Sequence, residues 1–165
     1  MSVKIRKALP SDIRQIIKNM KAVAKEKQYI FIEKVTSHTV DEYRQLVKDD
    51  DCLVLVAEAD GKTVGHLTLS LYGDVDKARH VRDVSMLIID DYRGMGIGTQ
   101  LLEAAIIWAR SKRDIKKLVL GVFSNNKQAF KLYQKMGFKL DGVKKQQYFI
   151  NGKYEDEINM ALFLR

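Results

Sequence analysis

The sequence contains one cysteine, one proline and three histidines. A single cysteine cannot form an internal disulfide, and Cys52 opens the apolar run CLVLVA, which indicates a reduced thiol in the core. The histidines, His38, His66 and His80, lack the spacing of a zinc site, so we expect no metal cofactor. The scarcity of proline argues against a disordered region.

Long apolar runs are also absent. No stretch approaches the ~20 residues that a membrane span requires, and the opening MSVKIRKALPSD lacks the apolar core of a signal peptide. We therefore expect a cytoplasmic protein with no membrane partner. The chain has 165 residues, 46% hydrophobic and 30% charged, which predicts a single domain over 1–165.

Positive charge is in excess, with 29 lysines and arginines against 21 acids and a net charge of +8. This balance favours an anionic ligand, which could be a nucleic acid or a phosphorylated cofactor. The basic residues are dispersed, however, and the interleaved aromatics of a single-strand RNA platform are missing. A nucleic-acid partner is therefore not expected.

The first third of the chain predicts a strand followed by two helices. The segment VKIRKA at 3–8 alternates apolar and basic residues, as a half-buried strand does. A helix should follow with Ser11 as its cap and Asp12 in its first turn. A second short helix is expected around 39–48, after a mobile loop within 29–40.

Two turn signals predict hairpins. Asp60-Gly61 and Asn151-Gly152 each lie between β-rich runs, and both pairs suit a type I′ turn, which needs positive φ at both central residues. The first hairpin should fall in the middle of the chain and the second at its end.

Between these hairpins, strands near 80–89 and 117–123 flank a helix and form a parallel β-α-β crossover. A further helix at 125–136 should end at Gly137 in a left-handed cap. The expected order is β-α-(α)-β-β-β-α-β-α-β-β, an α/β (α+β) fold with a mixed sheet and helices on its faces.

The segment RGMGIG at 93–98 places three glycines at the entrance of the central helix. Glycine there costs backbone entropy, so a bare backbone must be needed. A phosphate bound by amides at the helix N-terminus would need one, and Gly96 and Gly98 would let it approach without a Cβ in the way. The spacing matches neither a Walker loop nor a dinucleotide fingerprint.

The pattern Arg/Gln-x-x-Gly-x-Gly/Ala at a strand end resembles the pyrophosphate loop of the GNAT superfamily of acyl-CoA N-acyltransferases. A second segment, SNNKQAFKLYQKMGF at 124–138, is similar to that family's Asn-x-x-Ala-x-x-x-Tyr and Gly-Phe pattern. The matching positions are Asn126, Ala129, Tyr133, Gly137 and Phe138. One departure is Asp90, which occupies the place of a common proline and predicts a slightly looser loop.

The resemblance implies transfer of an acetyl group from acetyl-CoA to a primary amine. It implies Tyr133 as the acid that protonates the departing thiolate, and the backbone amide of Ile88 as an oxyanion donor. The implied cofactor-binding residues are Met86, Leu87, Ile88, Arg93, Gly94, Met95, Gly96, Ile97, Gly98, Thr99, Asn126 and Tyr133. The alternative role of Asn126 is a helix cap, and that of Tyr133 is a core aromatic.

The general base is expected on the strand before the loop, where Asp83 is the first choice and His80 the second. Either residue could instead be a solvated strand residue. Glu155 and Asp156 are interpreted as hairpin charges that could face the amine if the last hairpin borders the acceptor cleft.

The segments 78–94 and 148–164 are similar to a small GNAT branch that acetylates free amino acids or related small amines. The first alternative is a protein acceptor, at an N-terminus or a lysine, as in enzymes that modify ribosomal proteins. A further alternative is a non-catalytic module that binds acyl-CoA. Homodimers are frequent in the family, and apolar faces on the last strands could pair.

Overall fold

A computed structural model describes residues 2–28, 31 and 33–165. Residues 29, 30 and 32 belong to the loop expected to be mobile, and that part of the expectation lies outside the described residues.

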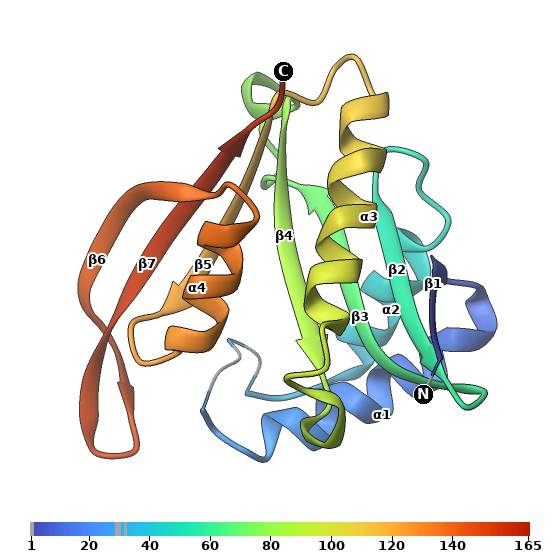
Figure 1. Ribbon diagram of the computed structural model, residues 1–165, viewed down its shortest axis with the longest axis horizontal. Coiled ribbons are helices and arrows are strands. Elements are labelled where there is room, and N and C mark those ends of the chain that lie inside the picture. Colours follow the sequence, from blue (N-terminus) through green and yellow to red (C-terminus); the bar gives the residue numbers. More distant parts are fainter. Residues whose placement is uncertain (1, 29–30, 32) are drawn as a thin grey trace.

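The fold is built on a seven-stranded mixed sheet in the order β1-β2-β3-β4-β5-β7-β6 (Figure 1). Only β4 and β5 run parallel among the described pairs, as expected for a β-α-β crossover. The strands are β1 (Val3–Lys7), β2 (Leu53–Ala59), β3 (Lys62–Leu71), β4 (Val81–Ile88), β5 (Lys117–Phe123), β6 (Lys139–Ile150) and β7 (Lys153–Phe163).

Helices cover both faces of the sheet (Figure 1). The helices α3 (Ile97–Ser111) and α4 (Lys127–Lys135) lie on one face, and α1 (Ile13–Ala24) and α2 (Ser37–Leu46) lie on the other. This arrangement confirms the expected mixed sheet and the expected order of elements. Three short 3₁₀ turns, at Pro10–Asp12, Asp76–Ala78 and Asp90–Tyr92, were not anticipated.

Alternation along the strands separates two apolar cores. On β2, Leu53, Leu55 and Ala57 face the core under α3, whereas Val54 and Val56 face the core under α1 and α2. Successive side chains of a strand point to opposite faces, so one apolar run serves both cores. Both faces of β2 are therefore buried, as CLVLVA suggests, and Cys52 is buried too.

Both expected turns have the geometry their residues suggest. Asp60 and Gly61 have φ of 50° and 72°, and Asn151 and Gly152 have φ of 50° and 79°. Positive φ at both central positions is the type I′ pattern. Gly137, with φ of 94°, follows the end of α4 in the left-handed conformation, so that expectation is also confirmed.

The expected Ser11 cap is wrong. A 3₁₀ turn at Pro10–Asp12 leads into α1, so Asp12 is the residue before the helix. No described side chain caps the first turn of α1, and Asp12 Oδ2 accepts instead from the preceding N–H of Leu9 at 2.7 Å. Ser11 itself is exposed. The reason is that the Asp12 carboxylate is anchored from the neighbouring strand, whereas Ser11 has no such partner among the described side-chain contacts.

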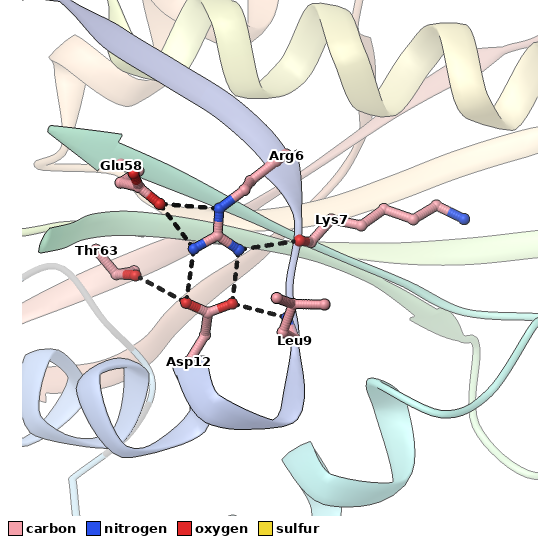
Figure 2. Close-up of polar contacts among 6 residues, drawn as sticks. All are labelled: Arg6, Lys7, Leu9, Asp12, Glu58 and Thr63. Carbon is pink, nitrogen blue, oxygen red and sulfur yellow. Dashed lines mark hydrogen bonds and ion pairs between the residues drawn. The ribbon is translucent and has the colours of Figure 1, made fainter. Parts of the chain in front are cut away.

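That anchor is Arg6 of β1 (Figure 2). Its guanidinium donates to both carboxylate oxygens of Asp12, at 2.7 and 2.9 Å, and to Glu58 of β2 at 2.9 Å. Bidentate pairs of this kind are among the stronger polar contacts in proteins. The network ties the start of α1 to the edge of the sheet, and it holds the pKa of Asp12 below its ordinary range.

Replacing Asp12 with Asn should lower the free energy of unfolding at pH 7 by about 2 kcal/mol, because Arg6 and the Leu9 amide lose a charged acceptor. Since the pKa of Asp12 is depressed in the folded state, its stabilisation is present at neutral pH. It disappears as the pH falls below the ordinary carboxyl value of 3.8.

Urea denaturation at pH 7 and at pH 3 measures both effects. The control is Asp41→Asn, which removes an exposed pair with Arg44 and should cost less than about 0.5 kcal/mol. Equal losses for the two variants would contradict the proposed anchor.

Candidate active site

A cleft of about 1670 Å³ opens where β4 and β5 diverge. The two strands pair over Val81–Asp83 and Lys117–Val119, and beyond these positions the described part of β4 pairs with β3 alone. Figure 1 shows the strands adjacent at one end and far apart at the other. The edge of β4 from 84 to 88 therefore faces the cleft with main-chain groups that no strand occupies.

The orientation of the Ile88 amide follows from the ladder with β3. Ile89 N–H donates to Val64 C=O at 3.1 Å, so this neighbouring residue points its N–H toward β3. Hydrogen-bonding direction alternates along an antiparallel strand. The N–H of Ile88 consequently points to the opposite side, into the cleft, where an oxyanion donor is expected.

The glycine loop ends at the N-terminus of α3. Gly94 and Gly96 have φ of 72° and 79°, a region that favours glycine, and Gly96 is the residue before the helix. The N–H groups of 97–99 belong to the first helical turn and have no acceptor within the helix. Together with the helix dipole they form a site suited to an anion.

Gly98 has a packing role besides the expected one in phosphate binding, which stays a prediction. A Cβ at this position would lie 2.9 Å from Leu132 Cδ2 and 3.3 Å from Met86 Cε. A bare backbone here lets α3 approach α4 and β4 closely. The sequence pattern of alternating glycines therefore combines two requirements, unusual φ at two positions and close packing at the third.

The side chain of Arg93 is committed to the protein. Its guanidinium donates to both carboxylate oxygens of Glu26 at 2.8 and 3.0 Å, to Ile88 C=O at 2.8 Å, and to Asp90 at 3.1 Å. These contacts join the end of α1 to the end of β4 and fix the loop. Asp90, which occupies the place of a common proline, accepts a hydrogen bond from Arg93 that proline could not accept.

Asn126 caps α4, because its side-chain oxygen accepts from Ala129 N–H at 3.2 Å. Its role as a helix cap is confirmed, and its role in cofactor binding stays a prediction. Asn126 and Tyr133 both line the cleft.

Tyr133 is buried on the side of the sheet that carries α3 and α4, with its ring 5.9 Å from that of Phe138. Burial raises the pKa of its phenol to about 12, so the group is protonated at neutral pH. Within the described part of the chain the Tyr133 side chain has no hydrogen-bond partner, which leaves its hydroxyl able to donate to a ligand.

Asp83 lies at the point where β4 and β5 separate, on the opposite face of the sheet from Val84 and the α3 core. Solvent reaches its side chain through the cleft, but the surrounding walls desolvate it. This desolvation and the nearby charge of Glu157 raise the pKa of Asp83 to about 6. A carboxyl poised near neutrality is suited to proton transfer.

His80, the second choice for the base, and His66 have separate locations. His80 is exposed and lies outside the main cleft. His66 is buried beneath α2, where Tyr43 hydroxyl lies 2.8 Å from its Nε2. Burial lowers the pKa of His66 to about 4, so the ring is neutral at physiological pH.

The cleft brings together every expected cofactor-binding residue except Met95. Met95 is 54% exposed and lies outside the lining, because its side chain projects from the loop between two glycines. Within the described chain, no group of three or more potential metal ligands occurs, and no helix is long and apolar enough to span a membrane.

Sequence reasoning missed Glu157, a buried carboxylate of β7 that lines the cleft. Its neighbours Glu155 and Asp156, which were considered in its place, have structural partners. Glu155 accepts from the Ser124 hydroxyl at 2.6 Å, and Asp156 accepts from Gln146 N–H at 2.8 Å. Strand alternation places Glu155 and Glu157 on one face and Asp156 on the other, but the register with β5 is needed to show that Glu157 reaches the cleft.

The fold and cleft together define an acetyltransferase. The model of the acetyltransferase (GNAT) family matches residues 19–138, and the chain belongs to this family. A solved structure of a GNAT-family acetyltransferase from Streptococcus pneumoniae is 26% identical, with a TM-score of 0.89, and the match covers 99% of this chain and 100% of that one.

Two curated relatives show the range of acceptors. The spermidine N(1)-acetyltransferase of Escherichia coli K12 is 28% identical over 74% of this chain, and the match spans only 64% of that relative's length. The N-alpha-acetyltransferase of Sulfurisphaera tokodaii is 31% identical over 96% of this chain and 91% of its own length.

Proposed function

We propose that this protein transfers an acetyl group from acetyl-CoA to the primary amine of a small molecule. The observation that carries the proposal is the divergence of β4 from β5, which joins an anion-binding helix terminus to a carboxylate poised near neutrality in one cleft. Membership of the acetyltransferase family supports the same reaction.

The residues of the cleft fit acetyl-CoA. The N–H groups of the loop and first turn of α3 would hold its diphosphate, and the free edge of β4 would bind the pantetheine arm through main-chain groups. Acetyl-CoA supplies an activated thioester. Of the expected set, Arg93 contributes through its backbone, because its side chain is bound to Glu26.

The chain's own groups then perform three tasks. Asp83 takes a proton from the amine, directly or through a water, and the Ile88 N–H stabilises the oxyanion as the C–N bond forms. The C–S bond breaks, and Tyr133 gives its proton to the departing thiolate. The second amine proton leaves through solvent, which also reprotonates Tyr133.

A small amine is supported by the likeness to the spermidine enzyme. The second candidate acceptor is a protein N-terminus, favoured by the longer match to the Sulfurisphaera tokodaii relative. Transfer to either acceptor releases the same product, free coenzyme A, so one assay can compare their rates.

The wild-type protein should release free thiol from acetyl-CoA when a small amine is added, and less when a peptide is added. A thiol-sensitive dye measures the release with a panel of amino acids, polyamines and N-terminal peptides. Faster turnover with peptides would replace the small-amine proposal by the second candidate. Tight acetyl-CoA binding without turnover on any acceptor would contradict the enzyme and favour a binding module.

The pH dependence of kcat/KM should report the ionisation of Asp83. Because only the ionised carboxylate accepts a proton, kcat/KM should fall as the pH drops through about 6. Asp83→Asn should lower kcat by roughly 10²–10⁴ while acetyl-CoA affinity, measured by calorimetry, changes little. A variant as fast as wild type would show that Asp83 is a solvated strand residue.

Tyr133→Phe should lower kcat about tenfold or more and leave acetyl-CoA affinity nearly unchanged, since only the donated proton is lost. Tyr154→Phe serves as the matched control, because that ring is exposed on the last hairpin. Equal kcat values for Tyr133→Phe and wild type would assign Tyr133 to packing alone.

A further inference from the structure

Glu157 is the buried acid of the cleft that the proposed mechanism leaves without a role. It lies on β7 opposite Phe123 of β5, whereas Asp83 lies on β4 opposite Val119 of β5. Val119 and Phe123 are an even number of residues apart, so they share one face of the sheet. The register therefore places the Glu157 and Asp83 side chains on the same face.

Gly121, between these two β5 positions, shows the direction of the Glu157 side chain. A Cβ on Gly121 would lie 3.0 Å from Glu157 Oε1 and 3.4 Å from its Cδ. The carboxylate thus lies across β5, toward the strand that carries Asp83. The absence of a side chain at Gly121 makes that approach feasible, and the two charges are close enough for Glu157 to raise the pKa of Asp83.

Two residues of β6 hold Glu157 in place. The Tyr148 hydroxyl donates to Oε2 at 3.0 Å, and Lys144 Nζ donates to Oε1 at 3.2 Å. The register of β6 shifts between Lys144 and Tyr148, and the N–H of Gln146 in this bulge donates to Asp156. Bulges often redirect side chains beside active sites, and this one brings Tyr148 to the cleft.

Aromatic rings flank the same carboxylate. Phe31 lies with its ring centroid 4.3 Å from that of Phe123 and 5.4 Å from that of Tyr148, and Phe123 lies 5.1 Å from Tyr148. Rings of this kind attract cations over their faces. Carboxylates and aromatic rings in one corner of a cleft suit an organic ammonium group.

The lysines near this corner of the cleft neutralise Glu157 but not Asp83. Lys117 is bound to Asp141 at 2.8 Å, and Lys144 is bound to Glu157 with its side chain 55% exposed. Within the described chain, no lysine, arginine or histidine forms an ion pair with Asp83. A bound ammonium would supply the missing positive charge.

We propose that Glu157 binds the ammonium form of the acceptor beside Asp83 and thereby selects cationic amines. This inference rests on the proposed function. Glu157 holds the charge, the ammonium gives one proton to Asp83, and the neutral amine that results attacks the thioester. The rings of Phe31 and Tyr148, which line the cleft and pack on the buried ring of Phe123, contact the carbon skeleton next to the nitrogen.

Two variants with opposite expected effects on the amine KM test the role of Glu157. Glu157→Gln should raise the KM for the amine about tenfold or more, and it should move the acidic limb of kcat/KM to lower pH, because a like charge beside Asp83 is removed. Lys144→Met should lower the amine KM and move that limb to higher pH, because Glu157 loses its neutralising partner. The KM for acetyl-CoA should stay within about twofold in both.

Glu155→Gln is the matched control, since this acid is on the same strand but binds Ser124 outside the cleft. Shifts of the same direction in Glu157→Gln and Lys144→Met, or none in Glu157→Gln, would overturn the proposal. Lys144 is largely exposed, so its variant keeps the test decisive if Glu157→Gln fails to fold.

Direct binding separates this inference from the proposed function. Calorimetry with 1,4-diaminobutane as the probe should show binding to wild type and about tenfold weaker binding to Glu157→Gln, whether or not acetyl transfer occurs. The corresponding diol should not bind. Binding without turnover would contradict the proposed function alone, and equal binding of the diamine to both proteins would contradict the role of Glu157.

Discussion

The short parallel pairing of β4 with β5 is the constraint on which the rest of the site depends. Three residues of each strand are paired, and the strands then separate. An unpaired strand edge is costly when it is buried away from water, because its amides and carbonyls need partners. In this fold the exposed edge lines a cleft, so a ligand with amide groups can satisfy it.

The divergence also connects the two faces of the sheet. The N-terminus of α3 and Tyr133 lie on the face that carries α3 and α4, whereas Asp83 and Glu157 lie on the face that carries α1 and α2. A flat, fully paired sheet would separate these groups. In the proposed reaction, the opening between β4 and β5 would let acetyl-CoA held on one face meet an amine held on the other.

Much of this arrangement was predictable from local sequence. Type I′ pairs located both hairpins, and the expected order of elements placed the helices between the strands. The glycine loop and the segment around Tyr133 both line the cleft, and their role in cofactor binding stays a prediction. Long-range features were not predictable. The contact that holds Asp12 at the start of α1 comes from Arg6 of β1, and the packing role of Gly98 depends on Leu132, a residue of another helix. Such contacts follow from tertiary packing, which local pattern does not encode.

The acceptor side was the least predictable for the same physical reason. Three acids are close together near the end of the chain, and the local sequence does not show which face of their strand borders the cleft. The register with β5 selects Glu157, Gly121 leaves space for its carboxylate, and the β6 bulge positions Tyr148 against it. These residues belong to the last hairpin and to β5, outside the glycine loop and outside the segment around Tyr133. Under the proposed role of Glu157, acceptor preference would change through substitutions in β6 and β7 that leave the glycine loop and the core the same.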